Sequence, residues 1–273
     1  MISVNGTQIA CTRFPDGTLS FRYDPYDFLT DHRIVWRYDD DSECMVLWNL
    51  VNHIRTHLPE ARISLVMPYL PNARMDRVKS ENVDEIFTLK WFAKFINFLN
   101  FRTVHITDPH SDVSAALIDR AVCVPATDNV FEVLRMIGAP MSELVLCFPD
   151  DGSKRKYSKQ LTGMEYVFGI KDREWRSGKI KSLTINKPEV VRGRTVLIVD
   201  DICSRGRTFV STAQVLKDAG ADKIYLYITH CENSIFDGEV LTSGLIEHVY
   251  TTDSIYRGEH EMISVLKGME EFT

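Results

Sequence analysis

The sequence predicts an α/β protein of two domains, each a mostly parallel β-sheet flanked by helices. Two observations support this class. Short apolar runs alternate with amphipathic helical patterns along both halves of the 273-residue chain, and that order builds parallel sheets covered by helices. In addition, Val196–Val199 is a continuous apolar, mostly β-branched run, which is typical of a strand buried on both faces.

Composition narrows the class of protein. Hydrophobic residues make up 44% and charged residues 26%, as in ordinary soluble globular proteins. The net charge of −6 argues against a nucleic-acid partner, which requires a basic face. The six cysteines include no C-x-x-C pair, which favours a reduced, cytoplasmic protein without a zinc site. The sequence shows no secretory signal and no apolar run near the ~20 residues that span a bilayer, so no membrane partner is expected.

The first half is predicted to end near Pro125, which gives an N-terminal domain over 1–126. Residues 1–38 should form strands and turns, including a hairpin turn at Asn5-Gly6. The acidic run Asp39–Asp41 is interpreted as a helix N-terminus stabilised by the helix dipole, without a catalytic role. The elements expected after residue 33 are strands over 34–36, 62–68, 103–107 and 121–124, a helix carrying Val46, Leu47, Leu50, Val51 and Ile54, and a helix over 83–99.

The second half, 127–273, is predicted to repeat this layout. Residues 174–194 are basic and polar, and they suggest a projecting hairpin or a mobile loop. The expected helices cover 129–137, 154–161, 209–219 and, as a short one, 235–241. The expected strands cover 144–148, 166–170, 195–199, 224–229 and 246–250.

A candidate site follows the strand at Val196–Val199. Asp200 and Asp201 come directly after it, and Ser204–Thr208 then leads into a helical pattern. Such a loop and helix N-terminus can bind a phosphate, and the carboxylates can accept hydrogen bonds from sugar hydroxyls or bind a metal ion. The alternative is a solvated strand end without function.

Several other expected strand ends carry chemical groups, and their order along the chain is informative. Thr195–Thr208 resembles the phosphoribosyl-diphosphate signature of type I phosphoribosyltransferases. The remaining segments, in order, are Arg13–Gly17, Val66–Tyr69 with Asn72–Asp76, Asp108-Pro109-His110, Phe148–Gly152 and Lys171-Asp172-Arg173. Together they resemble the ribose-phosphate pyrophosphokinase family across nearly the whole chain.

The resemblance implies two phosphoribosyltransferase-like domains: an ATP side in 1–126, and an acceptor site with a flexible catalytic loop, 171–194, in 127–273. In the implied reaction, the anomeric hydroxyl of a ribose 5-phosphate unit attacks the β-phosphorus of Mg-ATP, and AMP leaves. A homo-oligomer, dimer or hexamer, is implied because the adenine contact comes from a neighbouring subunit.

The resemblance also assigns residue roles. The implied catalytic residues are Lys171 and Arg173. Those for ATP are Phe14, Asp16, Arg74, Asp76 and His110. Those for the acceptor sugar phosphate are Asp200, Asp201, Ser204, Arg205, Gly206, Arg207 and Thr208. Mg²⁺ would be held by His110 and Asp150. Without the resemblance, the histidine would be read as structural as readily as functional, and the basic tripeptide as a solvated loop.

Three departures from the family pattern stand out. An acid of the adenine turn is Thr18 here, and a glutamine after Arg74 is Met75. The acceptor loop, normally Asp-Thr-x-Gly-Thr, has lost an acid and gained Arg205 and Arg207. Arginine binds phosphate bidentately and stacks on bases. We therefore expect either ribose 5-phosphate or an extended acceptor, with ADP-ribose as the candidate; the alternative is that the arginines face solvent or bind a regulatory anion.

Two competing classes remain open on the sequence. A phosphoribosyltransferase that consumes the activated sugar would share the strand at Val196–Val199 but need not keep Lys171-x-Arg173. An inactive, synthetase-like regulatory subunit would tolerate Thr18 and Met75. Formation of AMP without a nucleobase distinguishes the enzyme from both.

Overall fold

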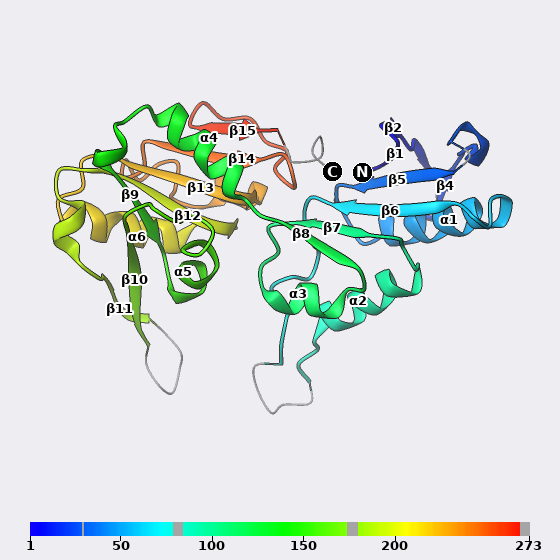
Figure 1. Cartoon of the computed structure of the whole chain (residues 1–273), viewed down its shortest axis with the longest axis horizontal. Helices are drawn as coiled ribbons and strands as arrows, with labels where there is room; N and C mark the ends of the chain where they lie inside the picture. The colour runs from blue at the N-terminus through cyan, green and yellow to red at the C-terminus, as the bar shows by residue number, and fades with distance from the viewer. Residues whose placement is uncertain (29, 79–83, 174–179, 268–273) are drawn as a thin grey trace. The chain divides into compact units, whose positions relative to one another are not determined.

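The computed structural model describes residues 1–28, 30–78, 84–173 and 180–267, and these divide into two compact units (Figure 1). Unit 1 comprises Met1–Val124, and unit 2 comprises Pro125–Lys267. Each unit has its own sheet and its own buried core. Within the described residues, no helix combines the length and the apolar character needed to cross a membrane.

Unit 1 is built on a six-stranded sheet in the order β2-β1-β5-β6-β7-β8. The last four strands pair in parallel, whereas β1 is antiparallel to both of its neighbours. The strands are β1 (Ile2–Val4), β2 (Thr7–Gln8), β5 (Asp31–Trp36), β6 (Arg62–Met67), β7 (Val104–Thr107) and β8 (Ala121–Val124). A separate hairpin contains β3 (Cys11–Arg13) and β4 (Leu19–Phe21). The helices are η1 (Pro25–Phe28), α1 (Glu43–His57), α2 (Thr88–Phe98) and α3 (Asp112–Leu117).

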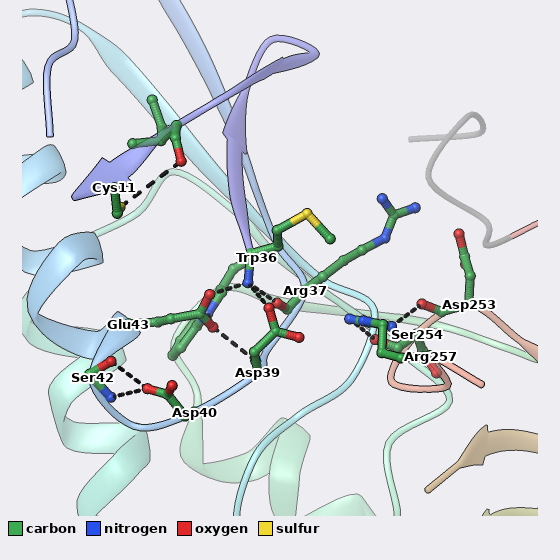
Figure 2. A network of polar contacts seen from close by, with 12 residues as sticks. Cys11, Trp36, Arg37, Asp39, Asp40, Ser42, Glu43, Asp253, Ser254 and Arg257 are labelled. Carbon is green, nitrogen blue, oxygen red and sulfur yellow. Dashed lines mark hydrogen bonds and ion pairs between the residues drawn. The ribbon is translucent and has the colours of Figure 1, made fainter. Parts of the chain in front are cut away.

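The acidic residues after β5 organise the start of α1 (Figure 2). The Trp36 indole N–H and the Asp39 backbone N–H both donate to Oε2 of Glu43, each at 2.9 Å. Asp40 Oδ1 accepts from the backbone N–H of Ser42 at 2.7 Å. These contacts tie the segment between β5 and α1 to the first turn of the helix, so the acidic run has a structural role here.

Unit 2 is built on a seven-stranded sheet in the order β11-β10-β9-β12-β13-β14-β15. All neighbouring strands pair in parallel except β11, which forms an antiparallel hairpin with β10. The strands are β9 (Leu144–Phe148), β10 (Tyr166–Arg173), β11 (Ile180–Ile185), β12 (Thr195–Cys203), β13 (Ile224–Cys231), β14 (His248–Thr252) and β15 (Ile263–Leu266). The helices are α4 (Thr127–Ile137), η2 (Met141–Glu143), α5 (Asp151–Tyr157), η3 (Pro188–Val191), α6 (Arg207–Asp218) and η4 (Asn233–Asp237).

Strand β12 lies inside this sheet and is buried on both faces, as its apolar run predicts. Val196 and Ile198 pack into one hydrophobic cluster of unit 2, and Leu197 and Val199 pack into the other. All four side chains are 0% exposed. Since burying one such side chain contributes about 1.5–3 kcal/mol, this strand fixes the frame on which the candidate site rests.

The predicted class is confirmed, but several element boundaries were wrong. The helix expected over 83–99 begins at Thr88, the one expected over 154–161 is α5, and the short helix at 235–241 is the 3-10 turn η4. Strand β12 extends to Cys203 because its pairing with β13 continues through Ile202 and Cys203. Asp200 and Asp201 therefore lie within the strand rather than after it. Strands β3 and β4 fall within the strands and turns expected over 1–38, whereas strand β15 and helix α3 were not anticipated.

Candidate active site

Two adjacent acids on β12 form the centre of the candidate site in unit 2. The backbone N–H of Asp201 donates to Oδ1 of Asp200 at 3.0 Å, and Asp201 is 6% exposed. Burial raises the pKa of Asp200 well above its ordinary value of 3.8, and the charges of Asp201 and Asp150 raise it further. The protein thus holds an acid where ionisation is costly, which is a property of functional sites as well as of some structural networks.

A third acid, Asp150, follows the neighbouring strand β9 and is tied to Lys171. Its Oδ1 accepts from the backbone N–H groups of Gly152 and Ser153 at 3.0 and 3.1 Å, so it caps α5. Its Oδ2 accepts from Nζ of Lys171 on β10 at 2.8 Å. Burial acts to raise the pKa of Asp150, but the hydrogen bond and charge of Lys171, with the bonds from Ser153, lower it overall.

Lys156 is a second cation beside these acids, and the sequence interpretation did not single it out. Its Nζ lies 3.7 Å from Oδ2 of Asp201. Three carboxylates therefore meet two ammonium groups, which leaves one negative charge in excess when all five are ionised. The sequence places Lys156 six residues after Asp150, on the helix that Asp150 caps. That relation was missed because the helix was predicted to start at residue 154, three residues after its actual start at Asp151.

The predicted phosphate loop, Ser204 to Thr208, comprises the connection from β12 to α6 and the first two residues of α6, and its geometry requires glycine at position 206. Gly206 has a φ of +73°, and a Cβ there would lie 2.1 Å from Cγ2 of Val240. Ser204 Oγ lies 3.0 Å from Ser234 Oγ. The side chains of Arg205 and Arg207 are exposed, and α6 begins at Arg207 without a side-chain cap. Its N-terminal N–H groups are thus suited to an anion.

Replacement of Gly206 by alanine is expected to destabilise unit 2 by about 1–3 kcal/mol more than the control below, the usual cost of overpacking, because the new methyl group overlaps Val240. Urea unfolding should show a lower midpoint. Gly163→Ala is the matched control, since Gly163 also has positive φ, +85°, but a methyl group added there would have no atom within 4 Å. Equal losses in both variants would contradict the requirement for close packing at Gly206.

In unit 1, the loops after β6 and β7 bring Asp76 and His110 together. Arg77 donates to both carboxylate oxygens of Asp76 at 2.8 and 3.0 Å. The hydrogen bond from Arg77 lowers the pKa of Asp76, and a hydrogen bond from Ser111 and the charge of His110 add to the effect. Asp76 is buried, whereas His110 and Arg74 are exposed. The ends of two neighbouring parallel strands thus place a histidine, an arginine and an acid on adjacent loops.

The third candidate segment is the tip of the β3–β4 hairpin. Thr18 donates to Oδ1 of Asp16 through its backbone N–H at 2.9 Å and its hydroxyl at 2.7 Å. The Thr18 hydroxyl is the main cause of a lowered pKa for Asp16. Phe14 is 50% exposed at the same tip. Thr18 therefore fixes Asp16 as a carboxylate beside an exposed aromatic ring.

Two further predictions concern the catalytic loop and the metal. Lys171 and Arg173 both lie on β10, and the hairpin with β11 agrees with the projecting hairpin expected there; residues 174–179 lie outside the described part of the chain. His110 belongs to unit 1 and Asp150 to unit 2. Among the residues that the structure describes, no group of three or more His, Cys, Asp or Glu side chains is arranged to hold a metal ion.

Comparison with known proteins identifies relatives. A family model described as a phosphoribosyl synthetase-associated domain matches residues 179–268. The ribose-phosphate pyrophosphokinase of Shewanella oneidensis is 31% identical over 76% of this chain and 64% of its own length. That of Mycoplasma pneumoniae is 27% identical over 71% and 59%, respectively. The chain thus spans about 60% of the length of these two curated relatives.

The fold comparison covers more of the molecule. A phosphoribosylpyrophosphate synthetase structure from Mycobacterium smegmatis matches 95% of this chain and 86% of its own length, with a TM-score of 0.76 and 18% identity. The ribose-phosphate pyrophosphokinase of Sulfolobus acidocaldarius aligns, at 26% identity, with 89% of this chain and 82% of its own length. In sequence the chain is thus similar to ribose-phosphate pyrophosphokinases, and its fold matches that of a phosphoribosylpyrophosphate synthetase.

Proposed function

We propose that this protein is an ATP-dependent diphosphokinase that transfers the β,γ-diphosphoryl group of ATP to the C1 hydroxyl of a ribose 5-phosphate unit and releases AMP. One observation carries the proposal. Strands β10, β9 and β12 are neighbours in the sheet, and together they assemble Lys171, Asp150 and the acid pair Asp200–Asp201 in one charged cluster. The phosphate-type loop follows the same strand as the acid pair.

The chemistry calls for positioning and charge neutralisation. The C1 oxygen forms a bond to the β-phosphorus, the bond from that phosphorus to the α,β-bridging oxygen breaks, and the bridging oxygen leaves with AMP. Lys171 and Arg173 stabilise the negative charge of the moving diphosphoryl group. Asp200 and Asp201 accept hydrogen bonds from the ribose hydroxyls, and the loop from Ser204 to Thr208 with the start of α6 binds the sugar phosphate.

The ATP side of the proposal uses unit 1. Phe14 and Asp16 contact adenine, from a neighbouring subunit of a homo-oligomer, and Arg74, Asp76 and His110 bind the triphosphate. The exposure of Phe14, Arg74 and His110 supports this assignment, since each can reach a ligand from its strand end or hairpin tip.

Mg²⁺ fits the chemistry of the donor set. Asp150 supplies hard carboxylate oxygen, the donor type that Mg²⁺ prefers, and two further carboxylates, Asp200 and Asp201, lie in the same cluster. Asp150 and His110 would hold the ion or its waters, and the bound ion would neutralise the phosphates of ATP. Lys171 donates to the same carboxylate of Asp150 at 2.8 Å.

For the acceptor, we propose ADP-ribose alongside ribose 5-phosphate. Both present a free anomeric hydroxyl, and ADP-ribose adds a second phosphate and an adenosine. The exposed Arg205 and Arg207 beside the loop support an acceptor of this kind, since arginine binds diphosphate and stacks on bases. The product would be ADP-ribose 1-diphosphate, an activated sugar suited to rebuilding NAD with nicotinamide, whereas ribose 5-phosphate would yield the precursor used in nucleotide biosynthesis.

The test is AMP release from ATP and Mg²⁺ with each acceptor and no nucleobase. We expect AMP with both sugars, and a selective loss of the ADP-ribose reaction in the double variant Arg205→Gln/Arg207→Gln. Arg135→Gln, on the exposed surface of α4, is the control for loss of an exposed arginine outside the loop. Absence of AMP with every acceptor would contradict the proposed function and favour a phosphoribosyltransferase or a regulatory subunit. AMP with ribose 5-phosphate alone would remove the ADP-ribose proposal.

A further inference from the structure

Helix α5 carries three consecutive cations near its end, and only one of them faces the acid pair. Arg155 forms an ion pair with Asp151 on its own helix at 2.7 Å. Lys154 lies over the Phe168 ring, 4.1 Å from its centroid. Lys156 instead lies 3.7 Å from Asp201 and is 18% exposed. The same helix therefore offers a matched pair of neighbours, Arg155 and Lys156, of which one contacts the acids of β12.

The charge of Lys156 acts where compensation is most needed. The side chain of Asp201 is only 8% exposed. Removing the cation from a buried carboxylate leaves an uncompensated charge and strongly destabilises the folded protein. Asp201 also repels Asp200, whose pKa is raised by burial and then by the charges of Asp201 and Asp150. Lys171 already compensates the negative charge of Asp150. Lys156 compensates that of Asp201, the other acid whose charge raises the pKa of Asp200.

The length of the contact defines how Lys156 acts. At 3.7 Å it is an ion pair rather than a hydrogen bond. Lys156 thus compensates the charge of Asp201 by proximity. Lys156 lies on α5, and Asp150, which follows β9, caps the same helix.

We propose that Lys156 is a positioning residue for the acceptor sugar, which keeps Asp201 charged and oriented toward the ribose hydroxyls. This inference rests on the proposed function, in which Asp200 and Asp201 bind the sugar. It separates the two lysines of the cluster: Lys171 serves the diphosphoryl group that moves, and Lys156 serves the sugar that receives it.

The test compares Lys156→Met with Arg155→Met, which removes the same charge one residue away. For each variant, steady-state rates give kcat and both KM values, and calorimetry gives the Kd of ribose 5-phosphate without ATP. We expect Lys156→Met to raise the acceptor KM and Kd about tenfold, as loss of a group that orients a ligand-binding side chain does. Its kcat and its KM for ATP should stay within about twofold, the pattern of lost acceptor binding. Lys156→Arg should restore the acceptor KM, and Arg155→Met should resemble the wild type.

Several outcomes overturn the inference. A lowered melting temperature in Lys156→Met with an unchanged acceptor KM would show a structural role only. Equal effects in Lys156→Met and Arg155→Met would show a general charge effect. If Lys156→Met does not fold, Lys156→Gln takes its place under the same criteria. If the wild type releases no AMP, the proposed function fails, but acceptor binding that is lost in Lys156→Met and kept in Arg155→Met still supports Lys156. Absence of acceptor binding by the wild type overturns both.

Discussion

Replacement of Lys171 by alanine is expected to lower kcat by about 10²–10³-fold while leaving the fold intact. This is the usual cost of removing one group that stabilises charge developing in a transition state. Lys171 is the lysine of β10 that reaches the acid cluster, with its ammonium 2.8 Å from Asp150. In the proposed reaction, the same ammonium exchanges this carboxylate for the transferring diphosphoryl group.

Rates of AMP formation under saturating ATP and acceptor measure this effect, and circular dichroism checks the fold. Lys159→Ala is the matched control, because Lys159 is exposed and has no hydrogen bond or ion pair within the described residues. We expect it to retain wild-type kcat. A Lys171→Ala enzyme with unchanged kcat would show that the catalytic assignment is wrong.

Much of the fold could be predicted because the signals for it are local. The apolar run Val196–Val199 predicts a strand buried on both faces, and both hydrophobic clusters of unit 2 include it. The acids that follow such strands must gather at one edge of a parallel sheet, so the proximity of Asp150 to the Asp200–Asp201 pair follows from strand order alone. The exact strand order was not predictable, but the alternation of strands and helices restricts the sheet to a small number of possible orders.

The details that failed depend on contacts between distant residues. The extension of β12 to Cys203 results from pairing with β13, more than twenty residues later in the chain. The start of α5 at Asp151 results from the Asp150 cap, which competes with the helical periodicity that begins later. Lys156 acquires its partner Asp201 only in the folded sheet, 45 positions further along the chain. Thr18 illustrates a substitution whose role, the fixing of Asp16, appears only in the folded turn.

Replacement of Asp200 by asparagine is expected to stabilise the protein at neutral pH and to impair the reaction. The folded-state pKa of Asp200 is raised above its ordinary 3.8 by burial and by Asp201 and Asp150. Between these two values the folded protein binds more protons than the unfolded chain, so stability falls as pH rises through that window. Asparagine removes this loss and keeps the Oδ1 that accepts from the Asp201 N–H. The melting temperature should rise, by roughly 2–4 °C for each kcal/mol regained.

The same change should lower kcat/KM for the acceptor by about 10- to 100-fold, since a hydrogen bond to a charged group contributes about 1.5–3 kcal/mol. Melting curves from pH 4 to 8 and acceptor titrations measure the two effects. Asp222→Asn is the control, because Asp222 is exposed and should alter neither quantity. A melting temperature that falls, or keeps the wild-type pH dependence, would show that Asp200 carries no electrostatic strain. A higher melting temperature with unchanged kcat/KM would show that ionised Asp200 destabilises the fold but does not bind the acceptor sugar. The acceptor site would then lie away from β12.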